Sequence, residues 1–281
     1  MKNTTLAILV GLLFFCCFCA KAENLPAQTE NKSKWLDDYK KPVGLTYSAK
    51  AVLQTTYLWR GLYCGALNLQ PSASVGYGGL YFNAWASVCS ATWMFDRFQP
   101  EVDLTLGFAR WGVDLSLVYI HNFDCRFFDF ANYPDKGNRL EIDLRYTVSS
   151  KLPLSFLWAT RIAASDSYLT QTGDTARAYS TYFELSYAHS FPYDITLRGA
   201  VGFTPWRSFY TLFQQDFACQ NIELSLSKDW SLAEHCGLKL QGVLSINPSA
   251  LAKDKTTAEW HPAEPYWQSI NTNLALIVYL K

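Results

Sequence analysis

The chain has 281 residues, of which 49% are hydrophobic and 17% are charged, and this composition excludes an intrinsically disordered protein. Its 24 Lys and Arg residues equal its 24 Asp and Glu residues, so the sequence has no net positive charge with which to hold a nucleic acid. Aromatic residues make up 16% of the chain although mean hydropathy is only −0.03. This combination is unusual, and the pattern of residues along the chain has to explain it.

Residues 1–22 have the features of a secretory signal peptide. Lys2 is followed by an uninterrupted apolar run over residues 6–20, which is shorter than the ~20 residues of a membrane-spanning helix. Ala20 and Ala22 form a small-x-small cleavage site, so we expect export and cleavage after Ala22. Residues 23–43 are polar and charged and are predicted to form a flexible segment, which leaves residues 44–281 for the folded part.

From residue 45 onward the dominant pattern is an alternation of apolar and polar residues. Leu140, Ile142 and Leu144, for example, alternate with charged residues. Because successive side chains of a strand point to opposite faces, such a segment has one apolar face and one polar face. The pattern predicts about twelve strands, close to residues 45–60, 69–77, 80–90, 101–108, 113–123, 139–148, 152–164, 178–189, 193–203, 221–227, 238–247 and 269–280.

The links between these segments alternate in length. Short links lie at residues 77–79, 109–112, 149–151 and 190–192, and longer ones at residues 61–68, 91–98, 124–137, 165–175, 204–215 and 248–267. Short turns at one rim and long loops at the other are typical of outer-membrane barrels. Residues 228–237 are the exception, because they predict a long link where a short one is expected.

The positions of the aromatic residues favour a membrane barrel over a secreted soluble β-protein, which alternates in the same way. Rings at both ends of an apolar band are what lipid interfaces select. The predicted fold is therefore all-β, a single-domain transmembrane antiparallel up-and-down β-barrel of about twelve strands. The aromatic residues expected at strand ends are Tyr57, Trp59, Tyr63, Phe108, Trp111, Tyr119, Phe123, Tyr187, Tyr193, Phe203, Trp206, Trp267 and Tyr279.

Three segments of the chain resemble the TorF-type porin family. Residues 56–62 contain the Tyr-x-x-Arg-Gly motif in which that family's first strand ends, residues 79–88 are similar to its Gly-aromatic-x-x-x-Trp-Ala-Ser segment, and residues 100–108 to its Glu-x-Asp strand. The matches cover about a quarter of the chain. The resemblance implies an outer-membrane barrel with a pore function. The chain departs from usual barrel proteins at its end, where Leu280-Lys281 replaces a terminal aromatic residue.

Charged residues on the polar faces are the candidate lining of a lumen. They either face one another across a water-filled passage and orient small polar solutes, or form ion pairs that fill a narrow barrel. Twelve strands fall between the about eight of a filled barrel and the about 16 to 18 of an open porin, so size does not decide. Arg60, expected at the outer rim, is either a constriction residue or a cap on loop carbonyls. The candidates are Lys50, Arg60, Glu101, Asp103, Asp114, Arg139, Glu141, Asp143, Arg145, Arg161, Glu184, Arg198, Glu223 and Lys239.

Cysteines and histidines offer fewer signals. Five cysteines follow the signal peptide, and Cys64 with Cys89 is the favoured disulfide because their strands are expected to lie close, with buried thiols as the alternative. No phosphate-binding, dinucleotide-binding or metal-binding motif occurs, so neither a cofactor nor a metal is predicted. His121 and His261, both expected at the outer side, leave a rim-located hydrolase of lipid or peptide as a remote alternative.

The sequence thus predicts a porin-like channel in an outer membrane that lets small polar solutes or ions pass passively. Its expected partners are outer-membrane lipid and small polar solutes, without nucleic acid. A barrel with a closed lumen, acting structurally or in surface recognition through its long loops, is the alternative. The identity of the solute and the formation of homo-oligomers stay open at this point.

Overall fold

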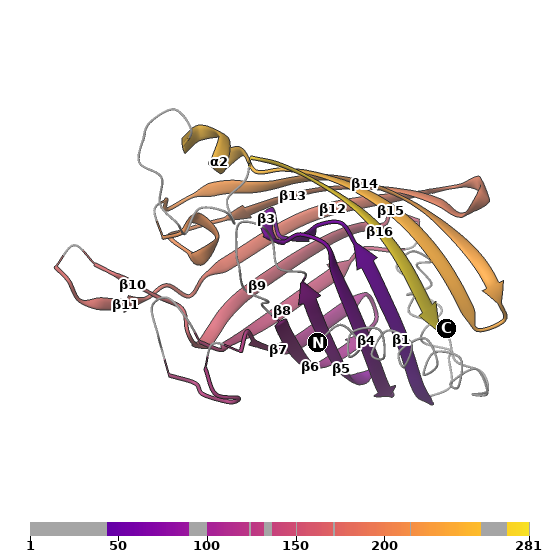
Figure 1. Cartoon of the computed structure of the whole chain (residues 1–281), viewed down its shortest axis with the longest axis horizontal. Helices are drawn as coiled ribbons and strands as arrows, with labels where there is room; N and C mark the ends of the chain where they lie inside the picture. Colours follow the sequence, from indigo (N-terminus) through magenta and orange to yellow (C-terminus); the bar gives the residue numbers. More distant parts are fainter. Residues whose placement is uncertain are drawn as a thin grey trace, which may run out of the picture.

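The computed structural model describes residues 44–89, 100–123, 125–131, 137–149, 151–170, 172–213, 215–253 and 269–280. Twelve strands form a closed barrel in the order β1-β16-β15-β14-β13-β12-β9-β8-β7-β6-β5-β4, and every neighbouring pair is antiparallel. Figure 1 shows the wall curling around an interior. The ring follows chain order and closes where β1 pairs with β16, so each strand is bonded on both sides.

The wall strands and the smaller elements have the following bounds. The wall consists of β1 (Leu45–Gln54), β4 (Asn68–Tyr77), β5 (Leu80–Cys89), β6 (Pro100–Arg110), β7 (Val113–His121), β8 (Arg139–Thr147), β9 (Leu154–Ala164), β12 (Thr181–Phe191), β13 (Ile195–Thr204), β14 (Ala218–Ala233), β15 (Cys236–Ile246) and β16 (Ile270–Leu280). The other elements are β2 (Tyr57–Trp59), β3 (Leu62–Gly65), β10 (Ser167–Leu169), β11 (Thr175–Arg177), α2 (Pro248–Lys253) and the 3-10 turns η2 (Pro192–Asp194) and η3 (Phe209–Thr211).

The two faces of the wall are inverted relative to a soluble barrel. In β12, Leu185 is 50% exposed whereas its neighbour Glu184 is 7% exposed, and in β14 Leu224 is 51% exposed whereas Ser225 is 3% exposed. Apolar side chains therefore point outward and polar ones inward, the pattern of a barrel whose outer surface meets hydrocarbon. The predicted all-β transmembrane barrel of twelve strands is confirmed. In the described part of the chain, no helix is long and apolar enough to cross a membrane.

The two rims differ as the link lengths predict, with one correction. Residues 228–237, expected to form a long link, belong almost entirely to strands, because β14 runs to Ala233 and β15 begins at Cys236. Trp230 faces Leu238 across the hairpin. The Asp229 carboxylate lies 3.6 Å from Lys239 Nζ, so an ion pair supports the pairing beyond the predicted strand end. At the opposite rim the β10–β11 hairpin projects away from the wall (Figure 1).

The first predicted strand is interrupted. β1 ends at Gln54 rather than at residue 60, and Thr55 and Thr56 donate their backbone amides to Leu274 and Asn273 of β16. The chain then forms the separate hairpin β2–β3, which contacts interior side chains of the wall. The assignment of Tyr57 and Trp59 to a lipid interface is therefore wrong, because these rings face the barrel interior.

Tyrosines lie over glycines on the inner surface of the wall. A Cβ atom on Gly107 would lie 2.4 Å from the Tyr81 ring, and one on Gly237 would lie 2.3 Å from the Tyr279 ring. Each ring occupies the space that the missing side chain leaves on the neighbouring strand. Tyr279, expected at a lipid interface, lies inside instead and donates a hydrogen bond to Asp229 at 3.0 Å.

Candidate functional site: a constriction inside the barrel

The tip of the β2–β3 hairpin is formed by Arg60 and Gly61. Their φ angles are 51° and 79°, and two consecutive left-handed residues define the two-residue turn that fits the twist of a hairpin. A Cβ atom on Gly61 would lie 1.9 Å from the carbonyl oxygen of Gln220, so only glycine fits there. Arg60 adopts a conformation that costs energy for a residue with a side chain, and therefore its surroundings must hold it in place.

Arg60 is clamped between carboxylates and rings. Its Nη2 atom lies 2.8 Å from Glu141 Oε1 and 3.1 Å from Asp143 Oδ2, both on β8. The guanidinium also lies 4.7 Å from the centroid of the Trp59 ring and 5.2 Å from that of Tyr182. Only 9% of the side chain is exposed. This one charged group therefore joins the hairpin to two strands of the wall, β8 through the carboxylates and β12 through Tyr182.

A second segment, residues 205–217, contacts the hairpin through Phe209 and Tyr210. It connects β13 to β14 and contains η3, whose Tyr210 is completely buried. The Tyr210 hydroxyl accepts a hydrogen bond from Arg60 Nη1 and donates one to Glu141 at 3.4 Å. The Tyr210 and Trp59 rings are 5.5 Å apart. Hairpin and loop are thus in direct contact within the barrel.

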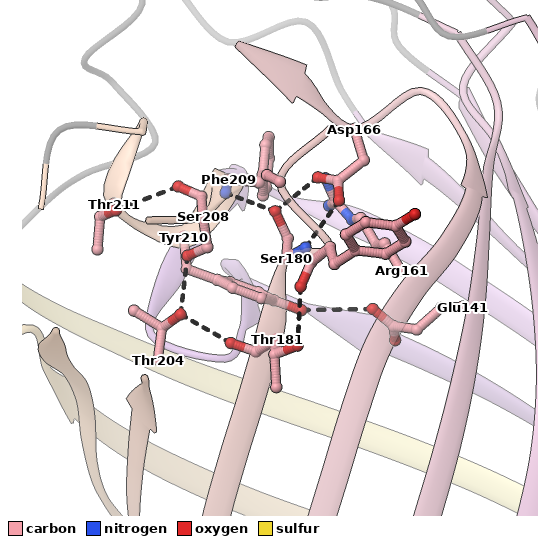
Figure 2. A network of polar contacts seen from close by, with 12 residues as sticks. Glu141, Arg161, Asp166, Ser180, Thr181, Thr204, Ser208, Phe209, Tyr210 and Thr211 are labelled. Atoms are coloured by element: carbon pink, nitrogen blue, oxygen red, sulfur yellow. Dashed lines mark hydrogen bonds and ion pairs between the residues drawn. The ribbon is translucent and has the colours of Figure 1, made fainter. Parts of the chain in front are cut away.

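Figure 2 shows how this loop is held. Thr204 donates to the Thr181 carbonyl at 2.7 Å, and its hydroxyl oxygen accepts from Ser208 at 2.9 Å. The Phe209 backbone amide donates to Ser180 Oγ at 2.8 Å, and Ser180 in turn donates to Asp166. Each of these polar groups is buried and partnered, which makes the loop a specific structure rather than a loose insertion.

Arg161 extends the same network toward the wall. Its guanidinium lies 3.7 Å from Asp166 and 4.0 Å from the centroid of the Phe209 ring. Arg161 is completely buried, so its charge depends on these neighbours. The long β9–β12 connection and the 205–217 loop are therefore joined through one arginine.

The surroundings of Arg60 and Tyr210 determine the protonation of these two side chains, both of which lie outside the spanning strands. Burial by itself lowers the pKa of Arg60, but Glu141, Tyr210 and Asp143 raise it, and the net pKa lies above its ordinary value. Burial raises the pKa of Tyr210, which keeps the phenol protonated. Arg60 is therefore always a cation, and Tyr210 always has a proton to donate to Glu141.

Carboxylates line the wall next to the hairpin. The Tyr57 hydroxyl donates to Glu101 at 2.9 Å. Asn122 bridges Glu101 and Arg139, since its amide nitrogen donates to Glu101 at 2.7 Å and its oxygen accepts from Arg139. One oxygen of Asp103, shielded from solvent, has no hydrogen-bond partner among the described residues.

Several of the other predicted lining residues meet residues of opposite charge on neighbouring strands. Arg198 bonds Glu184 at 2.5 Å and Glu223 at 2.6 Å, joining three neighbouring strands. Arg145 stands directly opposite Asp114 across the β7–β8 pair. Asp114 also accepts a hydrogen bond from Tyr81 at 2.8 Å. Opposite charges are therefore brought together in local groups on neighbouring strands.

Below the hairpin, on the side of the short turns, lies a cavity of about 300 Å³. Two of its lining residues were predicted to line the lumen, Lys50 on β1 and Asp103 on β6. The whole lining consists of Lys50, Tyr57, Trp59, Ser72, Asn83, Trp85, Asp103 and Thr105.

The sequence pointed to the charged residues of the site but missed its aromatic ones. Tyr182, Phe209 and Tyr210 surround Arg60 and Arg161, and none of them was a candidate. The available signal was the loop itself, because residues 204–215 contain several aromatic residues in a long link where polar ones are usual.

Two further expectations concern cysteine and histidine. The side chain of Cys89 lies outside the described residues, so its disulfide with Cys64 stays a prediction. His121 Nδ1 lies 2.6 Å from Asn138 Oδ1, and the Phe127 ring covers the imidazole at 3.9 Å between centroids. His261 lies outside the described residues. Within the described ranges no three His, Cys, Asp or Glu side chains come close enough to hold a metal ion.

Comparisons with known proteins give only distant similarities. No protein-family model matches the sequence, and no curated protein matches it. Among solved structures, the NanC porin has 10% identity and a TM-score of 0.45 over 84% of this chain and 100% of that chain. An outer-membrane channel from Pseudomonas putida F1 has 10% identity and a TM-score of 0.41 over 92% and 99%. Salmonella typhi OmpF in complex with daunomycin has 8% identity and a TM-score of 0.37 over 89% and 99%. These values are too low to assign the chain to a family.

Proposed function

We propose that this protein is an outer-membrane channel of the TorF-type porin family, exported by a signal peptide at residues 1–22, through which small polar solutes or ions pass passively. The observation that supports the proposal is the closed ring of strands with apolar side chains outside and charged side chains inside. Its partners are the lipid of the outer membrane and the solutes that pass. The fourteen charged residues predicted to line the lumen are proposed to keep that role.

Passage in this proposal is controlled at the contact between the β2–β3 hairpin and the 205–217 loop. Arg60 and Tyr210 meet there, inside the ring formed by the wall. A solute passing this point exchanges part of its hydration for many modest contacts with charged groups of both signs, and leaves again because none of them binds tightly. The short-turn side beyond it is lined by Lys50 and Asp103.

One observation favours the alternative, a barrel with a closed lumen. Leu62, Tyr182 and Tyr210 are buried in one apolar cluster, against which Trp59 packs. Such a cluster fills an interior in the way side chains fill small barrels. In that case the long loops, rather than the lumen, would carry the function as a recognition surface.

Current measurements in a planar lipid bilayer separate the two functions. We expect small current steps from the purified wild-type protein, and larger ones from a variant in which residues 57–65 are replaced by a short Gly-Ser linker. A matched control removes β10 and β11, which project away from the wall (Figure 1), and it is expected to leave the current unchanged. Folded protein that gives no steps, with or without the hairpin, would reject the channel and leave the closed barrel.

A further inference from the structure

The cavity below the hairpin has the size of a small-molecule site. Its volume of about 300 Å³ is at the lower end of the range for ligand pockets. Wall residues of β1, β4, β5 and β6 form its sides, and Tyr57 and Trp59 of the hairpin form its boundary toward the constriction. Asn83 and Thr105 lie nearer the short-turn rim. An occupant would therefore touch both the rigid wall and the inserted hairpin.

Three aromatic residues, Tyr57, Trp59 and Trp85, line this space. Trp85 and Tyr57 have ring centroids 5.7 Å apart and planes tilted by 55°, so they form an angled wall rather than a stack. The Tyr57 hydroxyl is already bonded to Glu101, and its ring is what remains available. Trp59 adds a second indole. Rings of this kind bury the carbon-bound hydrogens of a ligand.

The polar groups of the cavity are a mixture of donors and acceptors. Lys50 contributes a donor to the lining, and Asp103 contributes a carboxyl group. Ser72 and Thr105 do both. Asn83 uses its amide nitrogen on Ala73 and Ser74, which leaves its oxygen as an acceptor. The lining thus holds one basic side chain, Lys50, and one acidic side chain, Asp103.

We propose that this cavity binds a neutral saccharide of one or two units, an inference that rests on the proposed channel and names its solute class. Hydroxyl groups both donate and accept, so they match the mixed polar lining, while the apolar face of a sugar ring matches Trp85 and Trp59. A cationic solute would meet the Lys50 ammonium, and an anionic one would lie against the acidic side chain of Asp103. An apolar solute would cover the Asn83 amide oxygen and the Asp103 carboxyl group without forming hydrogen bonds to them, at a cost.

Binding is measured on the full mature barrel folded in detergent micelles, by intrinsic tryptophan fluorescence during titration with glucose, glucosamine and glucuronate. We expect glucose to bind with a Kd in the millimolar range, on the order of 1 mM, and at least threefold more tightly than either charged sugar. Trp85→Ala is expected to weaken glucose binding at least tenfold. The matched control Trp230→Ala removes an exposed indole of β14 outside the cavity and is expected to leave the affinity unchanged.

Asp103→Asn keeps the shape of the side chain and provides a second variant whose folding is not endangered by a lost ring. It replaces one acceptor by a donor, and we expect a several-fold loss of glucose affinity. Folding of each variant is checked by its heat-dependent migration in detergent gels. Absence of saturable glucose binding in the wild type, tighter binding of a charged sugar, or unchanged affinity in a folded Trp85→Ala or Asp103→Asn variant would overturn the proposal.

The same preparations distinguish failure of the site from failure of the channel. A barrel that conducts in a bilayer but binds no glucose in micelles contradicts the saccharide site alone. A barrel that binds glucose with the expected loss in Trp85→Ala, yet gives no current steps, contradicts the channel and supports the site. The fluorescence measurement requires no passage through the constriction, because the cavity is lined by half-exposed residues on the short-turn side.

Discussion

Replacing Arg60 by alanine removes the group that joins the hairpin, β8 and the 205–217 loop. The variant loses ion pairs to Glu141 at 2.8 Å and Asp143 at 3.1 Å and the hydrogen bond to Tyr210. Alanine at this position still needs the left-handed φ of 51°, so the backbone strain remains while the contacts that offset it are gone. We expect the hairpin to leave the interior more often.

The size of the effect follows from the burial of the pair. Glu141 is 1% exposed, and removing one partner of a buried ion pair typically costs about 3–5 kcal/mol, because the other charge is left without compensation. Tyr57 and Trp59 still hold the hairpin through Glu101 and Tyr210, so we take the lower end of that range. At about 1.4 kcal/mol for each factor of ten, the open population rises about 10²-fold.

Single-channel recording measures both the open probability and the ion selectivity of Arg60→Ala. Loss of one cation beside Glu141 and Asp143 is expected to shift the reversal potential in a KCl gradient toward cation selectivity. Lys228→Ala is the matched control, since it also removes a cation, but one that is not among the fourteen proposed lining residues and that bonds the Tyr193 carbonyl oxygen instead. If Arg60→Ala keeps the conductance and the reversal potential of the wild type, Arg60 does not control the passage.

Three further outcomes are expected. Arg145→Ala leaves Asp114 without its cross-strand partner, and the reversal potential is expected to move toward cation selectivity; an unchanged value would remove Arg145 from the lining. Gly61→Ala places a Cβ atom 1.9 Å from a β14 carbonyl oxygen, so conductance is expected to rise while the barrel stays folded, and equal conductance would argue against hairpin control. Leu224→Lys on the outer face is expected to lower the unfolding free energy in urea by about 2–4 kcal/mol near the midplane, more than the control Leu224→Ala, and equal losses would contradict lipid contact.

The wall was predictable because each of its strands has two faces in different solvents. Because apolar and polar residues alternate, Leu224 points outward and Ser225 inward. Whether a residue faces the lipid or the interior can therefore be predicted from its neighbours in the sequence. The choice of partners is not local. Arg198 meets Glu184 and Glu223 only because three strands pair in one register around a closed ring, which no single segment of sequence specifies.

The hairpin was not predictable for a related reason. Tyr57 and Trp59 continue the alternation of β1, so the sequence reads as one longer strand to residue 60. The interruption arises because Thr55 and Thr56 bond to β16, a partner more than 200 residues away in the sequence. The Arg60-Gly61 turn then requires a left-handed arginine, a choice that local propensity disfavours and that only the interior contacts explain.

In the proposed channel, these contacts would also determine how the constriction opens. Arg60 carries two costs at once, a strained backbone and a charge taken out of water, and both are offset only while Glu141, Asp143 and Tyr210 surround it. Tyr210 in turn holds its place through the loop that Phe209 anchors to Ser180. A partial displacement of the hairpin would break the contacts of Arg60 while its backbone stayed strained and its charge stayed out of water. Intermediate positions of the hairpin are therefore less stable than the fully inserted or the fully released position. Opening is therefore expected to be all-or-none, with discrete current levels rather than a graded change.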